Sequence, residues 1–287
     1  MDRVWQSFLN FIQEMLVKAV LYVYSNIFSF VNEKISSVGS QLSISPADFS
    51  PTIFNMIKTL SENVILPVAG MILTFVACIE LIQMVIDHNN LANFETWFIW
   101  RWIIKTFIAV ELVTHVFDIT LAVFDVAGWV VSKSAGLIAG STDITANMSD
   151  FESTLWTMSD GQLLVVLFMA LLVWVGILVM SLIVWVIVYS RMIEIYMTIS
   201  LAPIPFSTMG NKEHSQMGWN YFRGLAALGF QGFLMMICIG MYAALVQTIT
   251  MSEDMIGSVW AVLGYTILLC FSLMKTSELS KSIFNAR

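Results

Sequence analysis

The stretch that decides the fold covers residues 163–189 and reads LLVVLFMALLVWVGILVMSLIVWVIVY. It is 27 residues long and contains no Asp, Glu, Lys or Arg. About 20 apolar residues in a helix are enough to cross the roughly 30 Å hydrocarbon core of a bilayer. We therefore expect a transmembrane helix here that tilts or protrudes from the membrane.

The composition of the whole chain extends this prediction. Of the 287 residues, 58% are hydrophobic and 11% are charged, whereas ordinary soluble domains carry about 25% charged residues. This excludes a soluble enzyme and predicts an all-α, polytopic membrane protein with five transmembrane helices. The five spans are expected at about residues 63–86, 102–131, 162–189, 222–250 and 255–274.

Two further regions precede these spans. In residues 1–32 the polar side chains recur at helical spacing and include Glu14 and Lys18, which predicts an N-terminal amphipathic helix. In residues 33–62, Ser, Gly and two prolines, Pro46 and Pro51, interrupt any long period, which predicts a polar extracytoplasmic connector with or without a short helix. The first residues lack the pattern of a secretory signal peptide, so we expect no cleavage there.

Lysine and arginine set the expected orientation, because the cytoplasmic ends of membrane spans are enriched in them. The residues that mark these ends are Arg101, Lys105, Arg191, Lys212, Arg223, Lys275, Lys281 and Arg287. The segments 132–161 and 251–254 are acidic instead and contain one base, Lys133. We therefore expect the N-terminus outside the cytoplasm, with the C-terminal tail, residues 275–287, inside. If the first helix also spans, the count becomes six and both ends are cytoplasmic.

A polar stripe in the second predicted span is the first candidate site. Glu111, His115, Asp118 and Asp125 fall on one face of a helix. An acid in mid-membrane costs roughly 2.5–3.5 kcal/mol, so we expect this face to meet other helices or water. Glu80, on the preceding span, is a candidate neighbour. The stripe is consistent with an ion or proton path, a hydrated lumen, interhelical hydrogen bonding or an oligomer contact.

The cytoplasmic end of the third span is the second candidate site. Arg191 and Glu194 are spaced to pair as i and i+3 on a helix. Pro203 and Pro205 cannot continue a regular helix, so we expect the chain to bend or end there near the inner leaflet. These four residues form a predicted boundary that could act as a hinge.

Small residues gather at the start of the fourth span, where they allow helices to approach closely. They are accompanied by one amide that can bond across a helix pair, and the set is Gly224, Gly229, Gln231, Gly232 and Gly240. We expect packing contacts here, including contacts between protomers of a homo-oligomer. Cys78, Cys238 and Cys270 lie in apolar stretches, and no spacing of Cys or His predicts a metal site. We expect no cofactor.

Four short motifs give the chain a resemblance to a known family. They are Arg191-Met-Ile-Glu194, Leu201-Ala-Pro203-Ile-Pro205-Phe206, Asn211-Lys212-Glu213 and Gly229-Phe-Gln231-Gly232. With them, residues 60–250 loosely resemble the TrbL-type polytopic inner-membrane subunit of type IV secretion systems, in the forms encoded on conjugative elements. The resemblance implies a non-enzymatic component of a DNA or protein transfer channel in the bacterial cytoplasmic membrane. It also implies a homo-oligomer that contacts pilin, core and ATPase components.

Two other function classes stay open at this point. An ion-coupled secondary transporter would use Glu80, Glu111, His115 and Asp118 as a relay, although no inverted repeat is visible in the sequence. An intramembrane hydrolase is less favoured, because the spans contain no recognisable catalytic motif. The net charge of −7 argues against bulk electrostatic binding of nucleic acid, so DNA is expected to make transient contacts if any.

Overall fold

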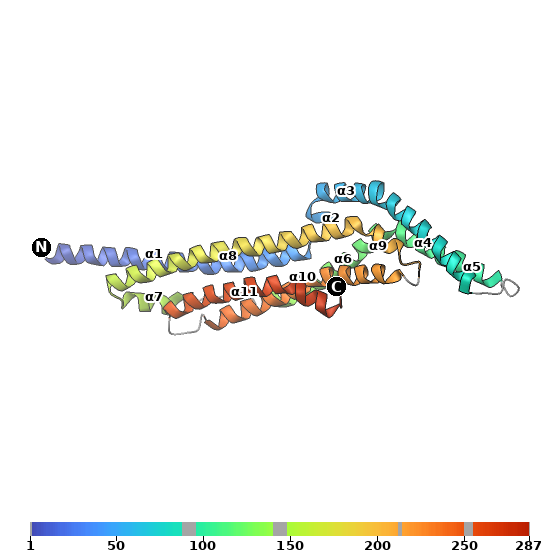
Figure 1. Ribbon diagram of the computed structural model, residues 1–287. Coiled ribbons are helices and arrows are strands. Elements are labelled where there is room, and N and C mark those ends of the chain that lie inside the picture. The colour runs from blue at the N-terminus through green and yellow to red at the C-terminus, as the bar shows by residue number, and fades with distance from the viewer. Residues whose placement is uncertain (1, 88–95, 140–147, 212–213, 250–254, 287) are drawn as a thin grey trace. The chain divides into compact units, whose positions relative to one another are not determined.

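The computed structural model describes residues 2–87, 96–139, 148–211, 214–249 and 255–286, and none of these forms a β-strand. Figure 1 shows the helices in chain order. Their bounds are α1 (Asp2–Ser43), α2 (Pro46–Phe49), α3 (Pro51–Leu60), a π-helical turn (Ser61–Ile65), α4 (Leu66–Asp87), α5 (Thr96–Thr114), α6 (Val116–Ala139), α7 (Met148–Trp156), α8 (Asp160–Leu201), α9 (Pro203–Ser207), α10 (Ser215–Ile249) and α11 (Met255–Ile283).

The chain divides into two compact units. Unit 1 contains Met1–Leu42, Val131–Val188 and Leu234–Thr276. Unit 2 contains Ser43–Val130, Tyr189–Phe233 and Ser277–Arg287. Helices α1, α6, α8, α10 and α11 each contribute residues to both units.

In unit 1, helices α1 and α8 run parallel. The side chain of Gln13, early in α1, donates to the carbonyl of Met158, just before α8, over 3.2 Å. Further along, Lys34 of α1 and Ser181 of α8 line one pocket. Helix α11 runs in the same direction as α8, because Gly176 lies against Leu263 and Met180 lies against Cys270.

Unit 2 contains two hydrophobic clusters. The first joins α6, α8 and α10 through Phe117, Phe124, Met192, Ile195, Tyr196, Ile199, Leu225 and Leu228. The second joins α4, α5, α9 and the start of α6 through Ala69, Leu73, Ala109, Val113, Val116, Ala202 and Phe206. Burying a side chain of this kind contributes roughly 1.5–3 kcal/mol, so these clusters fix the helix ends that carry the candidate sites.

Five helical segments are long and apolar enough to cross a membrane, which confirms the predicted fold class. They are Asn10–Ser43, Pro51–Ile86, Asp160–Ser207, Ser215–Thr248 and Trp260–Ile283. The membership differs from the prediction, because the N-terminal helix is one of the five. The predicted second span corresponds to a bent pair, Trp97–Thr114 and Val116–Leu137, which would make a sixth span if it crosses as one.

The N-terminal regions also differ from their predicted bounds. Helix α1 continues past residue 32 to Ser43, and the predicted connector contains α2, α3 and the π-helical turn. Pro46 and Pro51, which we expected to interrupt structure, each occupy the start of a helix. Proline is well suited there because it has no N–H to leave unpaired. Ser45 caps α2, and its hydroxyl accepts from the backbone N–H of Asp48.

The helix breaks at His115, with a bend of 64° between α5 and α6. Neither Pro nor Gly lies at the break. Instead, Thr114 Oγ1 donates to the Val110 carbonyl over 2.9 Å, and His115 Nδ1 lies 3.1 Å from the Glu111 carbonyl oxygen. Side chains that bond to carbonyls of the preceding turn are known to bend helices. The predicted span over residues 102–131 thus corresponds to two helices that meet at this bend, and their crossing of the membrane as one span stays a prediction.

Candidate functional site

Helices α8 and α10 meet in unit 2 at a buried polar contact that we call the Arg191 crossing, formed by Arg191 and the backbone of Gly229. Arg191 is only 6% exposed, and its Nη2 donates to the Gly229 carbonyl over 3.3 Å. Arg191 Nε, and Gln231 Oε1 further along α10, are buried and have no hydrogen-bond partner among the described residues. A buried unpaired polar atom destabilises the fold by roughly 1–3 kcal/mol. The apolar packing around Arg191 must therefore offset this cost.

The predicted pairing of Arg191 with Glu194 gives way to contacts with other helices. Glu194 forms an ion pair with Lys281, with Oε1 and Nζ 3.3 Å apart, while Arg191 turns to α10. Ser280 donates to the carbonyl of Ala227, and the rings of Phe230 and Phe284 lie 5.2 Å apart. We call the contacts of residues 280–284 with α8 and α10 the C-terminal clasp. Arg191 and Glu194 still interact electrostatically through space, while the hydrogen bond of Arg191 and the ion pair of Glu194 go to α10 and α11.

The small residues of α10 divide into close and open positions. A Cβ atom added to Gly229 would lie 3.1 Å from the Cβ of Ala127 on α6, which is tighter than ordinary packing. One added to Gly224 would meet no atom within 4 Å. Gly232 is buried and Gly240 is half-buried. Gly229 therefore packs against α6 of its own chain, and contacts of this set of residues between protomers stay a prediction.

The two predicted boundary prolines lie directly after the long helix α8. This helix ends at Leu201, and Pro203 begins the short helix α9, which packs against α4 and α5. Pro203 is buried and Pro205 is half-buried. The helix ends where the sequence predicted, and a hinge role for these prolines stays a prediction.

The predicted acidic stripe is exposed along its whole length. The side chains of Glu111 and His115 are 51% and 59% exposed and lie 3.4 Å apart, and Asp118 and Asp125 on α6 are also exposed. The bend at His115 separates Glu111 on α5 from the two aspartates on α6. The residues therefore form an open surface, which we continue to call the acidic stripe, instead of a row buried inside the chain.

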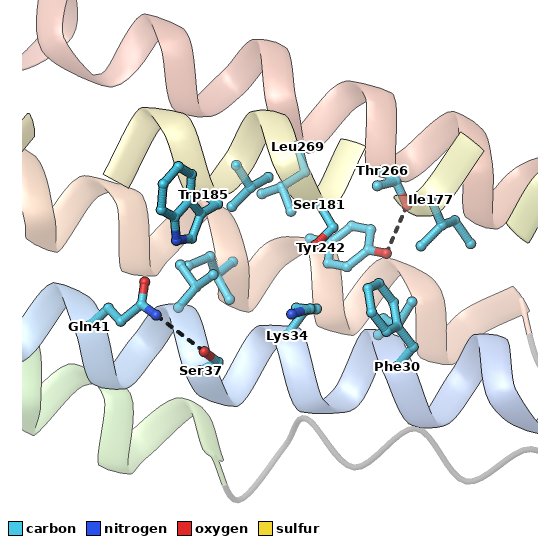
Figure 2. Close-up of a pocket in the computed structure, with 14 residues that line it drawn as sticks. Phe30, Lys34, Ser37, Gln41, Ile177, Ser181, Trp185, Tyr242, Thr266 and Leu269 are labelled. Atoms are coloured by element: carbon cyan, nitrogen blue, oxygen red, sulfur yellow. Dashed lines mark hydrogen bonds between the residues drawn. The ribbon is translucent and has the colours of Figure 1, made fainter. Parts of the chain in front are cut away.

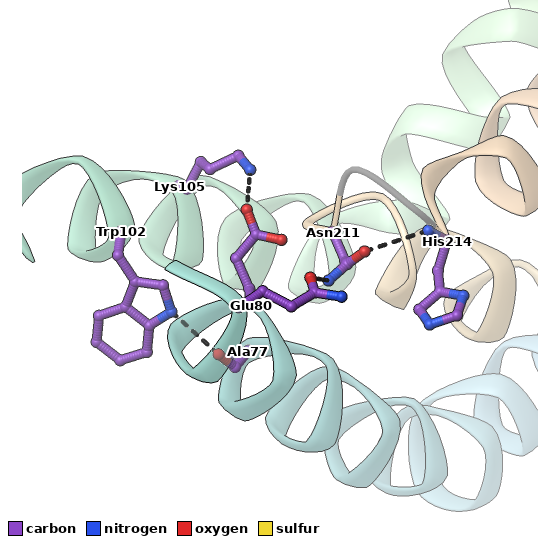
Figure 3. Close-up of polar contacts among 7 residues, drawn as sticks. Ala77, Glu80, Trp102, Lys105, Asn211 and His214 are labelled. Atoms are coloured by element: carbon purple, nitrogen blue, oxygen red, sulfur yellow. Dashed lines mark hydrogen bonds and ion pairs between the residues drawn. The ribbon is translucent and has the colours of Figure 1, made fainter. Parts of the chain in front are cut away.

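Glu80 does not join the acidic stripe. Its carboxylate pairs with Lys105 of α5, next to a hydrogen bond of 3.0 Å from Trp102 Nε1 to the carbonyl of Ala77 (Figure 3). These contacts tie the antiparallel helices α4 and α5 together. Lys105 could not be recognised from sequence as the partner of Glu80, because the two residues are 25 positions apart and share no helical period.

A second contact in the same region involves Asn211, the first residue of the Asn211-Lys212-Glu213 motif. Asn211 is fully buried and donates to Gln83 Oε1 of α4 over 3.3 Å. Its own Oδ1 accepts from the backbone N–H of His214 over 3.2 Å, so it also shapes the start of α10 (Figure 3). Lys212 and Glu213 of this motif lie outside the described residues. Within the described ranges, no three His, Cys, Asp or Glu side chains come together to hold a metal ion.

One of the comparisons with known proteins identifies a family. A family model described as TrbL/VirB6 plasmid conjugal transfer like protein matches residues 31–203. This match covers Arg191, Glu194 and Pro203 but ends before Asn211 and the Gly229 motif. No curated protein and no solved structure matches the chain. The family match covers more than half of the sequence, and the chain is therefore a multi-pass membrane protein that belongs to the TrbL/VirB6 plasmid conjugal transfer-like family.

Proposed function

We propose that this chain is a non-enzymatic subunit of the inner-membrane platform of a type IV secretion machine used in conjugation, and that it works as a homo-oligomer. Family membership supports a role in conjugal transfer. The exposed acidic stripe carries the finer proposal. Four titratable side chains lie uncovered on α5 and α6 of a protein whose neighbouring helices are apolar.

The cost of lipid exposure explains why the stripe indicates an assembly. Helix α6 buries Phe117 and Phe124 in the core of unit 2, while Asp118 and Asp125 lie on its open face. An acidic side chain facing lipid costs roughly 2.5–3.5 kcal/mol. A second copy of the chain, another subunit or a hydrated lumen between copies would remove this cost.

The sign of the charge favours a platform over a DNA conduit. A wall with three carboxylates would repel the phosphates of DNA, which are spaced at one charge per about 1.7 Å of duplex. Contacts to DNA are therefore expected to be transient if they occur. The partners that fit this role are further copies of the chain and the pilin, core and ATPase components of the machine.

The transporter alternative loses support from the structure. Its relay required Glu80 beside Glu111, His115 and Asp118, but Glu80 is engaged by Lys105.

Helix directions in unit 1 support an orientation with the N-terminus outside and the C-terminus in the cytoplasm. Helices α1 and α11 both run parallel to α8, whose uncharged stretch runs from acidic Asp160 towards Arg191. The positive-inside rule directs the Arg191 end to the cytoplasm. Tyr196, near that end, donates to the carbonyl of Pro46 over 2.7 Å. This contact supports a cytoplasmic position for residues 44–50, opposite to the side expected from the sequence.

Cross-linking on the open face tests the assembly. Ala122 is exposed between Asp118 and Asp125, so Ala122→Cys leaves both acids in place. In a background without the three native cysteines, we expect a short bifunctional thiol reagent to give dimers and higher species. Val175→Cys on α8 is the matched control, since Val175 is 55% exposed on an apolar helix. Equal cross-linking at both positions would indicate random collisions and contradict the proposal.

Single cysteines also test the orientation. We expect a membrane-impermeant thiol reagent to label Asn10→Cys in intact cells, and to label Thr52→Cys and Ser282→Cys only after permeabilisation. Labelling of Thr52→Cys from outside with a protected Asn10→Cys would instead indicate that α1 starts in the cytoplasm. That outcome would match the arrangement with six spans and both ends inside.

A further inference from the structure

Unit 1 contains a pocket of about 250 Å³ between α1, α8, α10 and α11. Figure 2 shows that one wall comes from α1 and that the opposite wall comes from α8, α10 and α11. The opposite wall is largely apolar and includes Ile177, Val184 and Leu269. No residue of this pocket belongs to the acidic stripe or to the Arg191 crossing.

The α1 wall carries a short polar strip. Lys34, Ser37 and Gln41 follow i, i+3, i+7 spacing, which brings them to one face of the helix. The Gln41 amide donates to Ser37 Oγ over 3.4 Å (Figure 2). On the other side, the hydroxyls of Tyr242 and Thr266 bond to each other over 2.9 Å. Lys34 is thus the one charged side chain in the pocket lining.

Lys34 has no anionic partner among the residues that the structure describes. Its ammonium group lies 5.0 Å from the centroid of the Phe30 ring, a cation–π contact. Such a contact contributes roughly 0.5–2 kcal/mol and does not neutralise the charge. By contrast, Lys18 on the same helix pairs with Glu14 at 2.6 Å. The pocket therefore offers a cation without its counter-ion.

The size and depth of the pocket narrow the class of anion. One turn of helix, with a diameter of about 10 Å and a rise of about 5.4 Å, fills roughly 400 Å³. A partner helix therefore does not fit into about 250 Å³, whereas part of a hydrocarbon chain does. The lining residues Ser181 and Trp185 lie near the Tyr189 end of the uncharged stretch, where a membrane helix meets the headgroup region.

We propose that this pocket binds an anionic phospholipid, with the phosphate at Lys34 and part of an acyl chain against the apolar wall. Each requirement of such a ligand has a counterpart: a single cation, polar side chains beside it and an apolar surface behind it. With the orientation proposed above, the lipid comes from the cytoplasmic leaflet. The binding itself does not depend on that orientation or on the proposed function.

Native mass spectrometry of the full chain in mild detergent tests the proposal. The probes are phosphatidylglycerol and phosphatidylcholine with identical acyl chains, added at equal concentration. A basic residue near an anionic surface contributes roughly 1 kcal/mol, which corresponds to about a fivefold preference for phosphatidylglycerol. Lys34→Gln should bring the two lipids to equal retention. Lys18→Gln, the matched control on α1, should retain the preference.

A second variant tests the apolar part of the pocket. Ser181→Phe places a ring in the space assigned to the acyl chain and should reduce retention of both lipids. Its unfolding temperature shows whether the fold is intact. If the variant does not fold, Val38→Phe on the α1 wall serves the same purpose.

Two results would overturn the proposal. One is equal retention of both lipids by the unmodified chain, which would indicate a lipid-coated surface without headgroup recognition. The other is an unchanged preference for phosphatidylglycerol in Lys34→Gln. Binding of acidic peptides in preference to either lipid would assign the cation to a protein partner and would also overturn it.

Discussion

The Arg191 crossing and the acidic stripe both place charged groups on helices of unit 2, but the chain covers only the first. Arg191 is 6% exposed beneath α10, whereas Glu111 and His115 are more than half exposed. The crossing is closed by a glycine and by the C-terminal clasp, which let α8, α10 and α11 approach closely. The stripe lies beside a 64° bend that directs α5 and α6 apart. The polar groups of the crossing are therefore buried by the chain's own helices, whereas those of the stripe are free to contact a partner or water.

The strongest test of this comparison is Gly229→Leu against Gly224→Leu. At Gly229 even a Cβ would come within 3.1 Å of Ala127, while Gly224 has open space around it. Overpacking of this kind costs roughly 1–3 kcal/mol and occasionally more. We expect Gly229→Leu to lower the unfolding temperature in detergent by roughly 4–10 °C, with little change for Gly224→Leu.

This pair also separates folding from assembly. If Gly229→Leu kept the stability of the protomer but dissociated an oligomer, the glycine would face another copy instead of α6. Equal destabilisation by both variants would show that α10 tolerates no bulk at all, and the distinction between close and open positions would be lost.

A second, smaller effect is expected at the stripe, from Asp118→Asn against Asp118→Leu. Asp118 is exposed, so neither variant should change the free energy of unfolding of the protomer by more than about 0.5 kcal/mol. An amide still hydrogen-bonds across an interface, and we expect Asp118→Asn to retain both oligomer and transfer. Leucine removes such a bond, which contributes roughly 0.6–2 kcal/mol in membranes, so we expect weaker association by about 3- to 30-fold.

Transfer frequency and oligomer size, measured on the same variants, decide the role of the charge. Loss of transfer in Asp118→Asn with a normal oligomer would contradict a purely packing role and would favour a charged relay. A large drop in protomer stability would contradict the exposure of the stripe.

The sequence predicted those features that depend on neighbouring residues along the chain. Residues 163–189 lie within α8 because their apolar character alone requires a spanning helix. The end of this helix at Leu201 follows from the prolines that come next. The close approach of Gly229 to Ala127 of α6 involves a partner helix that could not be identified from sequence.

The features that the sequence did not predict depend on partners far along the chain. Glu194 and Glu80 pair with Lys281 and Lys105, which are 87 and 25 residues away. The bend at His115 coincides with side-chain bonds from Thr114 and His115 to carbonyls of the preceding turn, and no Pro or Gly marks the break in the sequence. Pro46 and Pro51 show the same limit, since a proline that ends one helix can equally begin another.

The smallest expected effect concerns the ion pair of the C-terminal clasp, and it tests whether the covered region relies on charge or on packing. Lys281 and Glu194 are 49% and 40% exposed, and exposed pairs contribute roughly 0.2–1 kcal/mol. Lys281→Glu should therefore lower the unfolding temperature by no more than about 2–4 °C. The double variant with Glu194→Lys should recover most of this loss, and high salt should reduce the difference.

Because Ser280 is buried and donates to Ala227 O, Ser280→Ala should cost about as much, roughly 1 kcal/mol, without any dependence on salt. A salt-independent loss in Lys281→Glu, or no recovery in the double variant, would show that packing and hydrogen bonding alone hold the clasp against α8 and α10.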